Sequence, residues 1–262
     1  MTTSSSPPPG AETGPEARTA GRGGRVLLVH GLWAGPSTWW RVGPMLEERG
    51  WQVERATLAG HGGRPLGAVR SVADLADDVV EHHAAGALVV GHSLGAVVAL
   101  ELAARASYAV GVLLEDPPGP GRTRRSREDA EQRTREDAAA RTDPHTAVTE
   151  LLHGHPTWTR RDARTVVEGR LRSDPALQRF SARHLSWDLP ARVAASPVPV
   201  GLLVAVGRYS ALAEPDRSAL TGSLAHVTEV GAGHHVHLDA PERWVAAVDA
   251  FGASLSRGGP PR

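Results

Sequence analysis

The feature that most constrains the fold is a serine placed between two glycines where one apolar segment ends and another begins. Residues 87–90 (ALVV) are a short apolar run typical of a buried strand, and residues 96–100 (AVVAL) have helical character. The five residues between them, GHSLG, place Ser93 in a sharp turn. Glycines at 91 and 95 let the strand and the helix pack closely around a strained serine. This G-x-S-x-G pattern predicts a nucleophile elbow, in which the serine hydroxyl stands exposed above a sheet.

The same turn predicts where negative charge would be stabilised. A helix that begins at Leu94 presents a backbone N–H beside the Ser93 hydroxyl, and we expect this amide to donate to a developing oxyanion. The second expected donor is Leu32, in a glycine-containing loop that follows the apolar strand 26–29. Trp33 adjoins this donor and is our candidate for lining an apolar substrate pocket. The competing interpretation of Trp33 is that it fills the core, as most large aromatic residues do.

Composition restricts the classes of protein that fit this pattern. The 262 residues suffice for one large α/β domain with an inserted subdomain. With 29 basic and 29 acidic residues, the net charge gives no reason to expect binding to nucleic acid or to a membrane. The absence of cysteine excludes disulfides, thiolate metal sites and a cysteine nucleophile. Without an apolar signal region or a membrane-spanning run, the sequence predicts a soluble cytoplasmic protein.

Strand-like and helix-like segments alternate along the chain, which predicts a parallel sheet with helices on both faces. The expected strands are 26–29, 51–56, 87–90, 109–114, 197–206 and 227–230, and the clearest helices are 37–49, 72–83 and 241–255. The alternation stops at 119–195, where prolines separate charged, helix-like pieces. We interpret 119–195 as a helical cap inserted into a core formed by 25–118 and 196–256. Residues 1–24 predict a disordered arm and 257–262 a flexible tail.

A serine hydroxyl becomes a good nucleophile when a base removes its proton, so the elbow needs a histidine from elsewhere in the chain. Among 13 histidines, His234 has the best position, in a glycine-containing loop (GAGHHVH) between the last expected strand and the closing helix. We expect His235 and His237 to neighbour the site or lie at the surface. No carboxylate spacing completes a histidine metal site, so no metal site is predicted.

Taken together, these motifs resemble the α/β-hydrolase superfamily, in its serine hydrolase branch. The matching motifs, in family order, are His30-Gly31 of the oxyanion loop, Gly60-His61-Gly62 of the G-H-G turn, the elbow at 91–95 and Gly233-His234 of the terminal histidine loop. The resemblance covers about residues 25–255. It implies a mostly parallel sheet of eight strands, a Ser/His/acid triad, no cofactor and hydrolysis through an acyl-enzyme.

The third triad member is where the sequence departs from the family. Most relatives carry their acid in a G-x-x-D turn after the strand equivalent to 202–206, whereas this chain has GRYS, with Ser210 at the acid position. Some family members place the acid after the preceding strand, and Asp116 lies at that spacing. We prefer Asp116, because the carboxylate must fix the tautomer of the histidine. The alternatives left open are Glu115, Glu214, Asp216, a true dyad and a degenerate site.

These inferences predict a serine esterase-like enzyme that cleaves an ester, thioester, lactone or related small acyl substrate. A C–C bond hydrolase or a lyase-like variant would use the same residues. The hypothesis from another class is a ligand-binding protein with the hydrolase fold and little turnover, which the absent G-x-x-D acid motivates. Hydrogen bonding between Asp116 and His234 would favour the enzyme. Neither the exact substrate nor the oligomeric state can be inferred from the sequence.

Overall fold

Alternating apolar residues give the central strands two buried faces. In β1 (Arg25–Val29), Val26 and Leu28 pack into the core on one side of the sheet, and Leu27 and Val29 pack on the other. β3 (Ala87–His92) is buried along its whole length. A sheet covered on both faces is the arrangement in which parallel strands are stable. The computed structural model describes residues 24–105, 107–119, 127–183, 187–206 and 210–257.

The predicted arm and tail lie outside the described residues, except for the one residue at the inner end of each. Within the described residues the strands form one parallel sheet in the order β2-β1-β3-β4-β5-β6. The remaining strands are β2 (Gln52–Arg55), β4 (Ala109–Glu115), β5 (Val200–Ala205) and β6 (His226–Val230). The expected number of eight strands is wrong, since the sheet that the described residues form has six. Eight came from the family resemblance, whereas the apolar segments of the sequence itself account for six.

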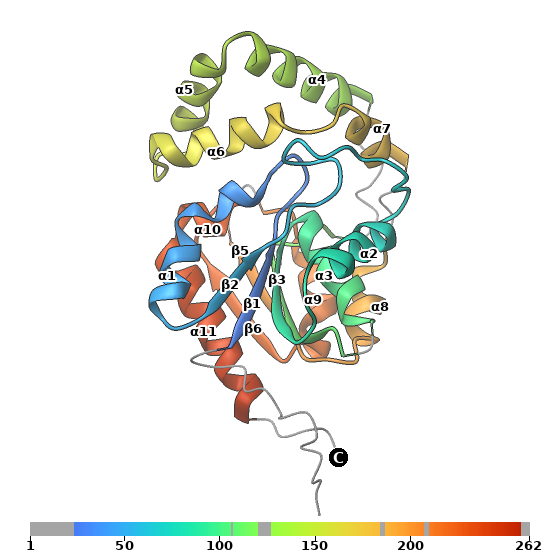
Figure 1. Cartoon of the computed structure of the whole chain (residues 1–262). Helices are drawn as coiled ribbons and strands as arrows, with labels where there is room; N and C mark the ends of the chain where they lie inside the picture. Colours follow the sequence, from blue (N-terminus) through green and yellow to red (C-terminus); the bar gives the residue numbers. More distant parts are fainter. Residues whose placement is uncertain (1–23, 106, 120–126, 184–186, 207–209, 258–262) are drawn as a thin grey trace, which may run out of the picture.

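Helices cover both faces of the sheet (Figure 1). One face carries η1 (Pro36–Trp40), α1 (Val42–Glu48) and α11 (Pro241–Arg257), and the other carries α2 (Val72–His82), α3 (Leu94–Ala103), α8 (Leu189–Ala194) and α9 (Glu214–Leu220). Two short helical segments, η2 (Thr221–Ser223) and α10 (Val236–Asp239), flank β6 in the chain. The predicted helix 37–49 is two elements, because a 3-10 segment precedes α1.

Among the described residues, no helix has both the length and the apolar character to cross a membrane.

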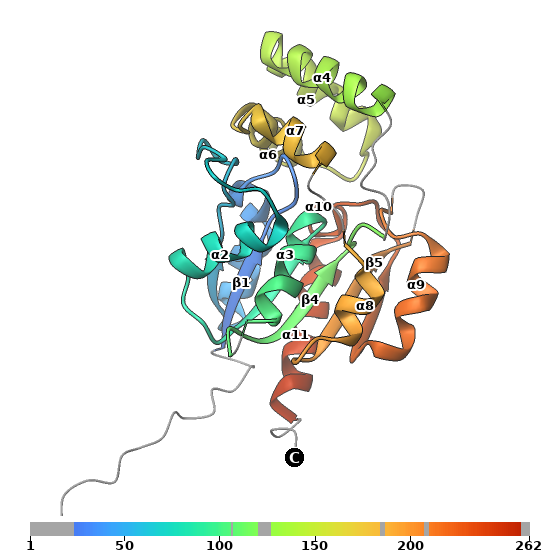
Figure 2. The ribbon, with the colours of Figure 1, turned by 90° about the vertical axis from the view of Figure 1, so that its right-hand side faces the viewer.

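Four helices lie over the carboxyl ends of the strands (Figures 1 and 2). They are α4 (Arg127–Thr142), α5 (Pro144–Gly154), α6 (Arg160–Leu171) and α7 (Ala176–Arg183), and we call them the cap. The range 119–195, in which the sequence predicts a cap, also contains α8, which packs through Leu189 and Val193 into the core on one face of the sheet. The cap therefore covers the edge at which parallel α/β sheets place their functional loops.

The turn between β3 and α3 is packed so closely that it requires glycine on both sides of Ser93. A Cβ at residue 95 would lie 2.1 Å from the carbonyl oxygen of Val29, and one at residue 91 would lie 2.1 Å from the carbonyl oxygen of Gly95. Backbone atoms cannot move away as the end of a flexible side chain can. The two glycines thus let α3 pack directly against β1 and β3.

We expect Gly95→Ala to lower the free energy of unfolding by about 3 kcal/mol or more, because the added methyl group overpacks rigid backbone. Urea denaturation monitored by tryptophan fluorescence measures this change. Gly35→Ala is the matched control, since a Cβ at residue 35 would meet no atom within 4 Å and the residue is extended. Equal denaturation midpoints for the two variants would contradict the proposed packing constraint.

Candidate active site

Ser93 sits in a strained backbone conformation at the end of β3. Its φ of 53° and ψ of −116° lie in a region that residues with a side chain seldom adopt. Two hydrogen bonds hold this conformation: Ser93 N donates to the Glu115 carbonyl (3.0 Å), and Ala96 N donates to the Ser93 carbonyl (3.0 Å). The Ser93 side chain remains partly exposed, and Leu94 begins α3 beside it. This is the conformation that the G-x-S-x-G pattern predicts.

The loop after β1 lies against the elbow. A Cβ at residue 31 would come within 3.2 Å of the Ser93 Cβ. The buried His30 fixes this loop, because its Nδ1–H donates to the Gly31 carbonyl (2.9 Å) and its Nε2 accepts from Leu58 N (3.2 Å). Leu32 is partly buried against the core. Trp33 is 7% exposed and has a φ of 58°, so most of its ring contributes to the core cluster.

Asp116 lies immediately after β4 and hydrogen bonds to His234. The Asp116 Oδ2 atom is 2.6 Å from His234 Nδ1 and also accepts from Ala211 N (2.8 Å). Its Oδ1 atom accepts from the Ser210 hydroxyl (2.7 Å). Asp116 is fully buried, with three of its acceptor positions occupied. Ser210, which stands where most relatives carry the acid, therefore contributes a donor to the acid of this chain.

The other acidic candidates have different partners. Glu115 bonds to His237, Glu214 forms an ion pair with Arg217, and Asp216 lies against Gly119. Among the candidate residues, the structure joins Asp116 to His234 by a hydrogen bond and packs the His234 ring against His92, the residue before Ser93. Leu94 follows Ser93 at the start of α3, and Leu32 follows Gly31, which lies against the Ser93 side chain.

Three hydrogen bonds with side chains help to hold the backbone of the loop that carries His234. Gly233 N donates to Asp239 Oδ2 (2.7 Å), the His92 Nε2–H donates to the His234 carbonyl (3.0 Å), and His237 N donates to Glu115 Oε1 (3.0 Å). The His234 side chain is 26% exposed. Because its Nδ1–H donates to a carboxylate, Nε2 is the nitrogen left to take up a proton.

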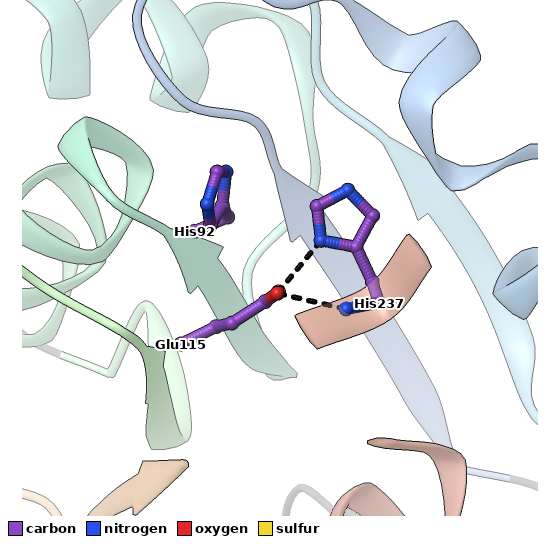
Figure 3. A group of neighbouring side chains, drawn as sticks. All are labelled: His92, Glu115 and His237. Carbon is purple, nitrogen blue, oxygen red and sulfur yellow. Dashed lines mark hydrogen bonds and ion pairs between the residues drawn. The ribbon is translucent and has the colours of Figure 1, made fainter. Parts of the chain in front are cut away.

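A second acid and histidine pair lies buried beside this loop. Figure 3 shows the Glu115 side chain reaching towards the ring and the main-chain nitrogen of His237. Glu115 Oε1 is 2.7 Å from His237 Nδ1, and Oε2 accepts from Trp244 Nε1 (2.8 Å). The other ring nitrogen of His237 is 2.7 Å from the Thr38 hydroxyl. All of these polar groups are buried, so each bond offsets the cost of removing it from water.

No local sequence pattern marks this pair, and the expectation that no carboxylate lies with the histidines in a metal set is wrong. Ligand atoms of His92, Glu115 and His237 lie within 4.8 Å of one another. His237 Nδ1 nevertheless donates a hydrogen bond to the Glu115 carboxylate, and His92 Nε2 donates one to the His234 carbonyl. A metal ion needs lone pairs at these atoms. We therefore interpret the cluster as a hydrogen-bonded support for the histidine loop.

Burial keeps several histidines near the site uncharged. Desolvation, with a smaller contribution from the neighbouring His61, lowers the pKa of His30 to about 3. Desolvation likewise lowers the pKa of His61 to about 4. The pKa values of His92 and His235 are well below the ordinary value, first because of burial and then because of surrounding histidines, including His234. The rings that pack around His234 are therefore neutral at neutral pH.

The lowered pKa values predict that the protein loses stability in mild acid. The ordinary value is 6.5, so between pH 6.5 and about 4 the unfolded chain binds protons that folded His30 and His61 do not. The two histidines make their full contribution to the free energy of unfolding above this window, and the contribution falls as the pH drops through it. We expect the free energy of unfolding to decrease by about 1.4 kcal/mol per pH unit for each histidine, measured by urea denaturation.

Comparing variants isolates this contribution from that of the carboxylates. In His61→Gln, the free energy of unfolding should depend less steeply on pH than in the wild-type protein. The difference in slope should correspond to about one bound proton. His82→Gln, at an exposed ring, is the matched control and should change the slope less. The same slope for His61→Gln and the wild type would show that burial of this ring does not cause the acid sensitivity.

Comparison with known proteins adds to this geometry. A family model described as the alpha/beta hydrolase family matches residues 26–248, from β1 into α11. The chain belongs to this family. The match spans the six strands described above, the elbow, the cap and the histidine loop. It explains why the four motifs occur in family order.

One curated relative of the hydrolase is the pimeloyl-[acyl-carrier protein] methyl ester esterase of Methylococcus capsulatus, 42% identical over 95 residues. The aligned segment is 36% of this chain and 37% of the relative, so the match spans little more than a third of either protein. In solved structures, the hydrolase resembles the N-formylmaleamic acid deformylase of Pseudomonas putida, with a TM-score of 0.69 and 24% identity over 87% of this chain and 92% of that one. The enol-lactonase of Burkholderia xenovorans has a TM-score of 0.63 and 22% identity over 88% and 92%. These structures share the fold.

Proposed function

We propose that this hydrolase is a cofactor-independent serine hydrolase that cleaves an ester, thioester, lactone or related small acyl substrate through an acyl-enzyme on Ser93. The observation that carries the proposal is the 2.6 Å hydrogen bond between Asp116 and His234, beside a strained elbow serine. A carboxylate on Nδ1 selects the tautomer in which Nε2 accepts a proton. That is the requirement for activating a serine hydroxyl.

In the proposed cycle, the Ser93 oxygen attacks the substrate carbonyl while His234 Nε2 takes the hydroxyl proton. The Leu94 and Leu32 amides donate hydrogen bonds to the oxyanion, and the Asp116 carboxylate stabilises the imidazolium. The imidazolium then protonates the leaving group, which departs and leaves the acyl group on Ser93. A water molecule, deprotonated by His234, attacks the acyl carbonyl. The acid product leaves, and the hydroxyl of Ser93 is restored.

The substrate class is supported by what the related proteins are named for. They include an esterase, the enol-lactonase and a thioesterase domain from the curacin biosynthetic pathway, which has a TM-score of 0.64 and 19% identity. Trp33 stays our candidate for a wall of the acyl pocket, because it follows the proposed oxyanion donor and its carbonyl lies close to Gly169 of the cap helix α6.

The reason for considering a ligand-binding protein no longer applies. It rested on the serine at position 210, which implied a histidine without an acid. Ser210 instead donates to Asp116, which itself bonds to His234. In the proposed triad, the acid therefore comes directly after β4, the strand next to β3.

Ser93→Ala should abolish hydrolysis of p-nitrophenyl acetate and labelling by a fluorophosphonate probe while leaving the circular dichroism spectrum unchanged. Asp116→Asn should lower kcat/KM by roughly 10³-fold to 10⁴-fold, because the amide no longer stabilises the imidazolium or selects its tautomer. Ser210→Ala is the matched control. It removes one donor from Asp116 but keeps the contact with His234, so we expect a loss of about fivefold to tenfold.

Two outcomes would contradict the proposal. Rates close to wild type in Asp116→Asn would exclude Asp116 as the triad acid. A folded wild-type protein that neither hydrolyses the ester nor reacts with the probe would favour the ligand-binding alternative.

A further inference from the structure

Two carboxylates fasten the start of the cap helix α6 to the core. The cap residue Asp162 is fully buried and accepts from Trp40 Nε1 (3.0 Å) and Arg41 Nη2 (2.5 Å) of the core. The core residue Asp239, at the end of α10, accepts at Oδ1 from Trp158 Nε1 (2.6 Å) and from the Thr157 hydroxyl (3.2 Å) of the cap. The cap therefore supplies Asp162 and the donors to Asp239, and the core supplies Asp239 and donors to Asp162.

The two carboxylates differ in what else they hold. The second oxygen of Asp239 accepts from Gly233 N at 2.7 Å, and Gly233 directly precedes His234. Trp158 is 6% exposed and contacts the same loop, with its ring edge-on to His235 at 5.5 Å between centroids. Asp239 thus bonds to the cap through one oxygen and to the histidine loop through the other.

Of the three bonds between side chains and the backbone of the histidine loop, the bond from Gly233 N to Asp239 involves a carboxylate that also bonds to the cap. The other two come from His92 and Glu115, on or next to the central strands of the sheet. A displacement of the turn at 157–158 would remove the donors that orient the Asp239 carboxylate. The Asp239 side chain would then keep its bond to Gly233 without the donors on its other oxygen, and it would rotate more freely toward water.

We propose that Asp239 is a positioning residue that couples the seating of the cap to the orientation of His234. With the turn at 157–158 on the core, both oxygens of Asp239 are bonded and the loop is fixed. With that turn displaced, the loop loosens and the His234 ring loses its fixed orientation. Proton transfer is then efficient when the cap is seated and inefficient when it is not. The inference rests on the proposed function in one respect, that His234 is the base.

Trp158→Phe tests the coupling, because it removes the indole N–H and keeps an aromatic ring. Trp40→Phe is the matched control, since it also removes an indole-to-carboxylate bond between cap and core, but at Asp162, whose described carboxylate bonds are with Trp40, Arg41 and Thr159 and not with the histidine loop. Hydrogen exchange of the peptide covering 231–237 is the first measurement. We expect exchange about tenfold faster in Trp158→Phe and within about twofold of wild type in Trp40→Phe.

The second measurement separates positioning from substrate binding. For p-nitrophenyl acetate, Trp158→Phe should lower kcat about tenfold with KM within about twofold, since a misplaced base slows the chemical step. Asp239→Asn should lower kcat at least as much, because its amide offers one acceptor where the carboxylate offers two. The double variant should be no slower than Asp239→Asn alone, since both changes break one connection.

Equal exchange of the loop in Trp158→Phe and Trp40→Phe would overturn the coupling, as would kcat losses that multiply in the double variant. Failure of the proposed function has a different signature, in which the wild-type protein is not labelled by the fluorophosphonate probe. The exchange measurement does not depend on activity and decides the coupling in that case as well.

Discussion

The pairing of β3 with β4 is the interaction on which the rest of the site depends. Their register places His92 opposite Glu115, so the next residues along, Ser93 and Asp116, leave the sheet side by side. The bond from Ser93 N to the Glu115 carbonyl continues the ladder into the elbow. Both residues have positive φ values, 53° for the serine and 40° for the aspartate. Backbone hydrogen bonds from Ser93 N to the Glu115 carbonyl and from Asp116 N to the Leu203 carbonyl stabilise these conformations, which would be costly in an isolated loop.

The same register produces two acid and histidine pairs with different surroundings. Asp116 bonds to a histidine that is partly exposed, whereas Glu115 bonds to one that is fully buried and reaches Thr38 on the far side. A buried ionisable pair gives little net stability, because desolvation opposes the attraction between its members. Its value here is geometric, since the Glu115 pair sets where α10 begins. The position of His234 follows from it.

The residues differ in how readily sequence reasoning finds them. Ser93 and His234 follow from local patterns, because an elbow and a loop after the last strand are recognisable from adjacent residues. Asp116 came from family spacing, and its distance to His234 depends on a register that periodicity does not determine. Glu115 with His237, and Asp239 with Trp158, join residues 122 and 81 positions apart, and no local pattern marks such pairs. The expected number of strands was wrong because it was taken from the family resemblance and not from the apolar segments of the sequence.

The serine at 210 has an electrostatic consequence. A Ser210→Asp change in the present chain would set a second carboxylate close to the first, where the hydroxyl is now 2.7 Å from Asp116. Two carboxylates that close are not both readily ionised, and one would tend to keep a proton. A hydroxyl at this position donates a hydrogen bond to Asp116 without adding a competing negative charge.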